Sequence, residues 1–104
     1  MVRHIVIWKL KDEFTPDEKR EYSAQIKFRL EALTGIIPEI KSLEVITELL
    51  PGSANADLML DGLFEDEQAL NHYQSHPEHQ KVSDFVGTLR QSRVCVDYQV
   101  TGNN

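Results

Sequence analysis

The segment that most constrains the fold is residues 2–10, VRHIVIWKL, because both faces of the strand it predicts are apolar. β-Branched and aromatic residues favour a β-strand, and side chains along a strand alternate between two faces. One face carries His4, Val6, Trp8 and Leu10, and the other carries Ile5 and Ile7. A strand of this kind needs cover on both sides, so we expect it in the centre of a sheet.

A helix follows directly, and its first turn is marked by residues 15–18, TPDE. Thr15 is a good N-cap, Pro16 suits the first helical position, and Glu18 completes a capping box. The apolar positions that follow have helical spacing, and they are Tyr22, Ile26, Leu30 and Leu33. Gly35 is a natural stop. We therefore predict a helix from Pro16 to about Leu33.

The middle of the chain predicts a β-hairpin. Residues 35–38, GIIP, form a connector, and apolar and polar residues then alternate through residues 43–49 as a second strand. Residues 51–55, PGSAN, form a turn. A third strand is expected over residues 57–64, with Leu58, Leu60 and Phe64 on one face and Met59 and Leu63 on the other. Because the link is short, the two strands should pair.

The last part predicts two short helices and a strand. Residues 66–73 have a helical pattern, which His76 should interrupt because it precedes Pro77. A second helix is expected from Pro77, with inward positions Val82, Phe85, Val86 and Leu89. Residues 93–100 alternate as a fourth strand, whose apolar positions are Val94, Val96, Tyr98 and Val100.

These elements predict a single α+β domain over residues 1–104. The order β-α-β-β-α-β is typical of the ferredoxin-like fold, a four-stranded antiparallel sheet with helices on one face. That leaves an apolar patch of Ile5, Ile7, Met59 and Leu63 without a helix to cover it. Soluble monomers rarely expose such a patch, so we expect a homodimer that closes an α/β barrel through its sheets.

Composition excludes several partners. Seventeen acidic against eleven basic residues give a formal net charge of −6, which repels nucleic-acid backbones. No apolar run approaches the ~20 residues that span a membrane. The apolar start is short, is interrupted by His4 and lacks a cleavage site, so we expect a cytoplasmic protein. The single cysteine, Cys95, cannot form an internal disulfide, and we expect it to pack as a small apolar residue.

Three candidate site residues should meet between the sheet and the helices, namely His4, Tyr73 and His79. An imidazole and a phenol in an apolar cavity can act as a general base and as a donor to a carbonyl oxygen. The alternative is that all three are hydrogen-bonded core residues. We expect the space to be apolar elsewhere, with a small apolar or aromatic ligand against the walls Val6, Trp8, Val82, Phe85 and Val86. A further alternative is that Trp8 fills it.

The histidines also suggest a metal site, because His72, His76 and His79 lie on one segment. Pro77 breaks the helical register between them, so we expect no metal there. No glycine-rich phosphate loop or nucleophile elbow is present in the sequence, and no cofactor is predicted.

Four segments together resemble the stress-responsive A/B-barrel (Dabb) family over nearly the whole chain. These segments are HIVIWKLKDEFTPDE, GIIPEIKSLEV, FEDEQALNHYQSHPEH and VCVDYQV. The histidine of the first strand, the G-x-I-P turn, the Y-x-x-H-P-x-H segment and the D-Y ending follow one another at family spacing. The resemblance implies a ferredoxin-like fold that dimerises through its sheets.

The resemblance leaves the activity open among three hypotheses. Plant members of the family include an olivetolic acid cyclase. The resemblance to that member implies that Tyr73, His79 and His4 are the functional residues of a lyase- or cyclase-like enzyme acting on a polyketide-like or aromatic substrate. If this chain is such an enzyme, His79 is the general base and Tyr73 donates a hydrogen bond to the carbonyl oxygen. The other hypotheses are a dimeric domain that binds a small molecule without catalysis, and a structural stress protein. Some relatives also imply a cation held by backbone carbonyls, here those of Thr34, Ile37 and Ile40.

Overall fold

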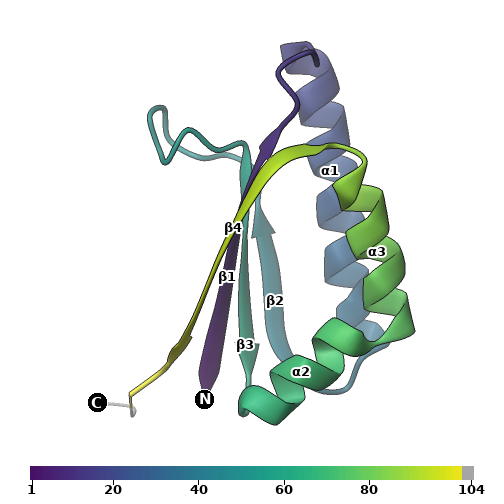
Figure 1. Cartoon of the computed structure of the whole chain (residues 1–104), viewed down its shortest axis with the longest axis vertical. Coiled ribbons are helices and arrows are strands. Elements are labelled where there is room, and N and C mark those ends of the chain that lie inside the picture. Colours follow the sequence, from purple (N-terminus) through teal and green to yellow (C-terminus); the bar gives the residue numbers. More distant parts are fainter. Residues whose placement is uncertain (102–104) are drawn as a thin grey trace.

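The computed structural model describes residues 1–101, which form one four-stranded sheet with the helices on one side of it (Figure 1). The elements are β1 (Val2–Leu10), α1 (Pro16–Ala32), the 3₁₀ turn η1 (Leu33–Gly35), β2 (Ile40–Ile46), β3 (Leu58–Phe64), α2 (Glu67–Ser75), α3 (Pro77–Gly87) and β4 (Arg90–Gln99). The sheet is antiparallel, in the order β2-β3-β1-β4. The predicted ferredoxin-like order is confirmed.

β1 occupies a central position, as its two apolar faces predict. It pairs with β3 on one side and with β4 on the other. His4, Val6 and Trp8 are buried beneath the helices, and this inner face forms the core together with Leu60 of β3. The predicted capping box of α1 is present: the amide of Glu18 donates to the Thr15 hydroxyl at 3.1 Å, and the Glu18 carboxylate accepts the Thr15 amide at 2.8 Å.

The ends of β2 and β4 differ from the prediction. β2 begins at Ile40 and ends at Ile46, whereas the sequence predicts residues 43–49, because its pairing with β3 runs from the pair Ile40–Phe64 to the pair Ile46–Met59. β4 begins at Arg90, three residues before the expected start, because its pairing with β1 continues past an irregularity to Leu10. The extent of pairing across the sheet sets these limits, and no local pattern records it.

His76 separates the two short helices, as predicted. Its backbone is extended, with φ −65° and ψ 135°, so it ends α2 and begins α3. Its ring nitrogen Nδ1 accepts the amide of Glu78 at 3.1 Å and so caps α3. α3 ends at Gly87, before the expected limit, although Leu89 still reaches the core.

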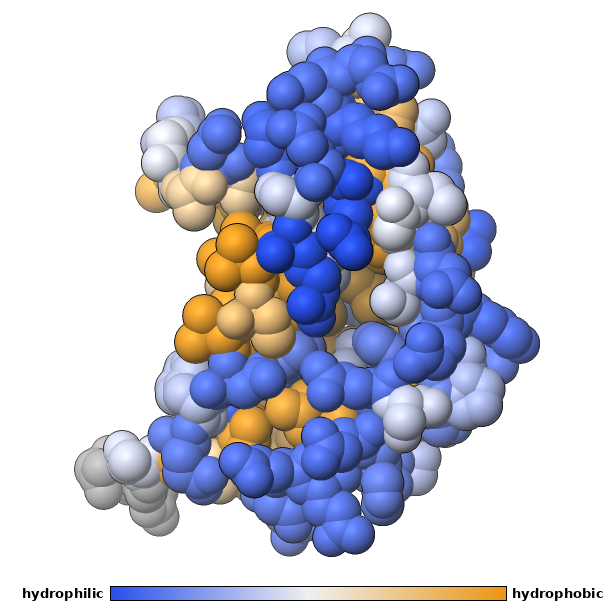
Figure 2. All heavy atoms as spheres, viewed as in Figure 1, coloured by the Kyte–Doolittle hydropathy of each residue, from blue (hydrophilic) through white to orange (hydrophobic). Residues whose placement is uncertain are grey.

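The opposite side of the sheet has no helix over it. Strand register places Ile7 beside both Met59 and Val94, and Ile5 beside Val96. We call this surface the outer sheet face, and its apolar members are Ile5, Ile7, Met59, Leu63, Val94, Val96 and Tyr98. Figure 2 shows apolar side chains gathered on the sheet side, away from the helices. The patch predicted from β1 and β3 is therefore uncovered, and β4 extends it.

Within residues 1–101, no helix is both long and apolar enough to cross a membrane.

Candidate functional site

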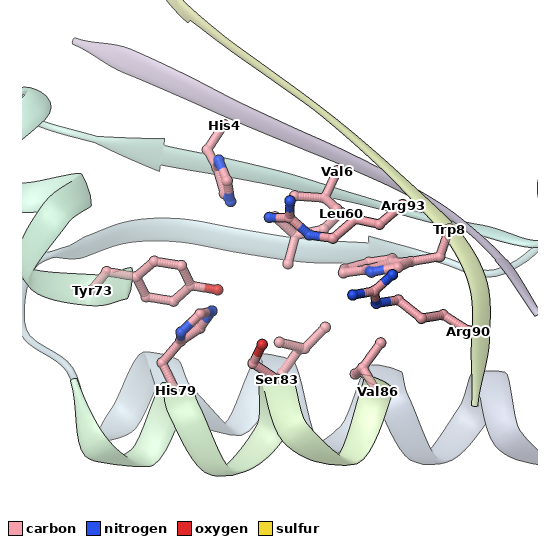
Figure 3. A pocket seen from close by; sticks show the side chains of 11 residues that line it. His4, Val6, Trp8, Leu60, Tyr73, His79, Ser83, Val86, Arg90 and Arg93 are labelled. Atoms are coloured by element: carbon pink, nitrogen blue, oxygen red, sulfur yellow. The ribbon is translucent and has the colours of Figure 1, made fainter. Parts of the chain in front are cut away.

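A cavity of about 250 Å³ lies between the inner face of the sheet and the helices (Figure 3). Every helix and every strand except β2 contributes to its lining. The lining residues are His4, Val6, Trp8, Leu30, Leu60, Tyr73, His79, Ser83, Val86, Arg90 and Arg93. The three residues that the sequence singles out thus face one space.

His4 is held by its neighbour across the sheet. Asp97 lies directly opposite it on β4, and its carboxylate oxygen is 2.5 Å from Nδ1 of His4. Since a carboxylate accepts a hydrogen bond, Nδ1 carries the proton and Nε2 is left without one in the neutral ring. His4 is 2% exposed, and its ring projects toward Tyr73 in Figure 3. Asp97 therefore fixes both the orientation and the tautomer of His4.

Tyr73 is fixed by the aromatic rings around it. Its ring centre lies 4.9 Å from that of Phe64, 4.4 Å from that of His79 and 6.1 Å from that of His4. Its hydroxyl points into the cavity and has no hydrogen-bond partner among residues 1–101. Burial raises the pKa of Tyr73, which the positive charge of Arg93 only partly offsets. The phenol therefore keeps its proton and is free to donate it in a hydrogen bond.

His79 is held so that one ring nitrogen is bonded to the backbone and the other can accept a proton. It is half-buried on α3, and its Nδ1 lies 3.0 Å from the carbonyl oxygen of Gln74. A carbonyl only accepts, so Nδ1 carries the proton and the lone pair of Nε2 is free. Burial lowers the pKa of His79, and the Gln74 hydrogen bond opposes that shift, while the charge of Arg93 adds to it. His79 is thereby held as a neutral base at neutral pH.

The predicted walls are partly wrong. Val6, Trp8 and Val86 line the cavity, and Trp8 leaves the space open. Val82 and Phe85 are not among the lining residues. The face of α3 that carries His79, Ser83 and Val86 points to the cavity, and Phe85 is rotated away from that face. Val82 is buried in the core, and the Phe85 ring lies under the guanidinium of Arg29 on α1, 4.0 Å from its carbon.

The expectation of an otherwise apolar cavity is also wrong, because two arginines of β4 line it. Arg93 alternates with Val94 along the strand, so period-2 reasoning places it on the inner face. Arg90 was missed because the predicted strand started three residues too late. Ser83 has no distinguishing signal in the sequence beyond its helical spacing from His79. The site is therefore apolar where β1 and β3 line it and positively charged along β4.

One group in the described residues has the spacing of a metal site, namely His4, Cys95 and Asp97, with ligand atoms within 4.8 Å of one another. Cys95 packs against the core as expected, and its sulfur is 3.7 Å from Nδ1 of His4. Burial and the charge of Asp97 raise the pKa of the Cys95 thiol. In this structure the three side chains contact one another, with Nδ1 of His4 bonded to Asp97 and the Cys95 sulfur 3.6 Å from the same carboxylate oxygen.

The three histidines considered for zinc do not form such a group among residues 1–101. Nδ1 of His72 lies 3.5 Å from Glu39, whereas the same atom of His76 caps α3 and that of His79 bonds Gln74. Pro77 begins α3, so His79 lies on a different helix from His72.

The backbone cation site implied by the resemblance lies around one turn. Thr34 is in η1 and Ile40 opens β2, and the Ile37 carbonyl between them already accepts the Ile40 amide at 3.2 Å. The cation stays a prediction, and the chemistry of the cavity does not depend on it.

Comparisons with known proteins agree with the fold. The model of the stress responsive A/B barrel domain family matches residues 2–100. An uncharacterised protein of Streptomyces coelicolor is 32% identical over 80 residues, which cover 77% of this chain and 80% of that protein. A dimeric protein of ferredoxin-like fold from Bacteroides fragilis is 32% identical, with 95% of both chains covered and a TM-score of 0.88. A hydroxynitrile lyase from Passiflora edulis is 19% identical, with 99% and 95% covered and a TM-score of 0.79.

Proposed function

Since the chain belongs to the stress responsive A/B barrel domain family, we propose that it is a homodimer whose cavity binds a small aromatic or polyketide-like carbonyl compound and moves a proton on it. One observation carries this proposal. Two histidines with defined tautomers and a tyrosine with an unbonded hydroxyl face the same cavity. Core residues ordinarily satisfy their polar atoms within the protein, and these three direct theirs into an open space.

Each residue has a role that follows from its environment. His79, neutral and with a free Nε2, takes a proton from the carbon beside the carbonyl, or from a hydroxyl. Tyr73 donates a hydrogen bond to the oxygen on which negative charge develops. His4, held by Asp97, lies next to the Tyr73 ring and orients the phenol.

The same groups serve either of two reaction types. When the base removes a carbon-bound proton, the resulting enolate can attack a second carbonyl carbon and close a ring, and the alkoxide that forms takes up the proton held by His79. When the base removes a hydroxyl proton, a carbonyl forms and the neighbouring carbon–carbon bond breaks, its electron pair leaving with the departing carbon, which takes up the proton held by His79. The hydroxynitrile lyase of similar fold is consistent with the second type. Both reactions need a neutral base beside a hydrogen-bond donor, which is what this cavity offers.

The homodimer is supported by the outer sheet face and by a relative. Val94 and Val96 are more than half exposed in the isolated chain, and they adjoin Ile5 and Ile7. The Bacteroides fragilis protein, 32% identical, is dimeric. An isologous contact between two outer sheet faces would bury this apolar surface.

Proton exchange from a simple ketone tests the catalytic proposal. We expect the protein to accelerate the exchange of the methyl protons of acetophenone in deuterium oxide, followed by NMR. His79→Gln should lose roughly 10²-fold or more of the acceleration, because a general base contributes at least that much. Tyr73→Phe, which lacks only the hydroxyl, should also be slower. The matched control is His72→Gln, since His72 is exposed on α2 outside the cavity.

Two results separate the hypotheses. Equal exchange rates for the wild type and His79→Gln would contradict a catalytic base. If His79→Gln instead unfolds at lower denaturant concentration and exchange is unaffected, the histidine is a structural core residue.

A further inference from the structure

We propose that the substrate is an anion, a small carbonyl compound whose carboxylate or phosphate group is bound by Arg90 and Arg93 at the β4 side of the cavity. This inference rests on the proposed function, because it assigns a substrate class to the same site.

The two arginines face the reactive residues across the cavity. Arg90 is the first residue of β4, and Arg93 lies opposite Trp8 in the strand register. In Figure 3 both guanidinium groups extend from β4 into the space toward Tyr73 and His79. Arg93 is close enough for its charge to lower the pKa of both of these residues. A ligand in contact with Tyr73 can therefore also reach a guanidinium group.

Neither guanidinium has an acidic partner within 4.0 Å in residues 1–101. Of the other three arginines, two have acidic partners and one lies over an aromatic ring. Arg3 pairs with Asp61 at 2.6 Å, Arg20 pairs with Asp17, and Arg29 lies over the Phe85 ring.

Two like charges directed into one cavity repel each other, and the repulsion is stronger where protein displaces water. The chain has seventeen acidic residues, yet none of those described neutralises this pair. Asp97, on the same face of β4, is engaged by His4. Cys95, next to Arg93 on that face, has its pKa raised by burial and so contributes no negative charge. An anion from outside would relieve the repulsion.

Guanidinium groups also select the chemistry of that anion. Their planar donors match the two oxygens of a carboxylate or of a phosphate. Ser83, on α3, adds a hydroxyl to the same lining. The cavity volume of about 250 Å³ lies just below the usual range of small-molecule sites, which suits a molecule with about one ring. The anionic group would lie near β4 and the carbonyl near Tyr73.

Calorimetry with three single-ring probes tests this inference. We expect benzoate or phenyl phosphate to bind at least tenfold more tightly than neutral benzamide, and the stronger of the two identifies the anion. Arg93→Gln and Arg90→Gln should each weaken anion binding roughly tenfold or more while benzamide binding is unchanged. The control is Arg20→Gln, which removes the same charge from the exposed side of α1. Added salt should weaken binding of the anions and not of benzamide.

Three results would overturn the inference. They are equal affinity for benzamide and both anions, no measurable binding of any probe, and dimer dissociation in the Arg90→Gln or Arg93→Gln variant with anion affinity intact. The last would mean that the arginines pair with the second subunit. Failure here is distinguishable from failure of the proposed function, because acetophenone has no anionic group and its exchange depends on His79 and Tyr73. Conversely, His79→Gln should still bind benzoate.

Discussion

Truncating Val94 to alanine should weaken dimerisation by an amount that can be worked out from the structure. Complete burial of the two lost methyl groups is worth about 1.5 kcal/mol. Val94 is 57% exposed in the isolated chain, so association can bury at most about half of that value, or about 0.8 kcal/mol per subunit. Because both copies in an isologous interface carry the change, the total is about 1.5 kcal/mol, which corresponds to about tenfold in the dimer dissociation constant.

Sedimentation velocity over a concentration series measures this shift. The matched control is Phe28→Ala, because Phe28 is 77% exposed on α1, on the helix side of the sheet. Its loss should leave the dissociation constant unchanged. A stronger variant is Ile7→Glu, which places an unpaired charge at the centre of the outer sheet face and should give monomer or aggregate. A wild type that is monomeric at micromolar concentration, or equal effects of Val94→Ala and Phe28→Ala, would refute the reasoning.

Three further results are expected. Folding lowers the pKa of His79, so below about pH 6.5 the unfolded chain binds a proton more readily than the folded chain does. The urea midpoint of the wild type should therefore decrease as the pH falls through this range, and that of His79→Gln should decrease less. Gly62→Ala should lower the free energy of unfolding in urea by about 1–3 kcal/mol, because the added carbon would lie 3.0 Å from the Leu43 side chain and 3.1 Å from the Phe64 side chain. An unchanged urea midpoint would mean that these side chains move aside at no cost. Elemental analysis of untagged protein should find less than stoichiometric zinc.

The parts of the fold that the sequence predicts are those with a local physical signal. The apolar alternation of residues 2–10 predicts a central strand because both of its faces are apolar, and the structure has it there. The capping box at Thr15 and the proline at 77 likewise define helix starts, since each acts within one turn. The limits of β2 and β4 depend on the length of their partners, which is non-local information.

The candidate site divides in the same way. Periodicity places His4, Tyr73 and His79 toward one space, because each lies on the apolar face of its own element. His4 and Asp97 are 93 positions apart in sequence, and their contact depends on the register between β1 and β4, so no local pattern predicts it. Arg90 was missed for a related reason, since it lies in the part of β4 that pairing with β1 adds.

The state of the His79 ring is the most direct test of the central claim, that the cavity holds a neutral base with a free Nε2. Long-range ¹H–¹⁵N correlation spectra across a pH titration report which ring nitrogen carries the proton, and the spectrum of His79→Gln assigns the signals. We predict that His79 has its proton on Nδ1, donated to Gln74, and that it titrates below 6.5. A proton on Nε2 at neutral pH, or a titration midpoint above 6.5, would contradict the account.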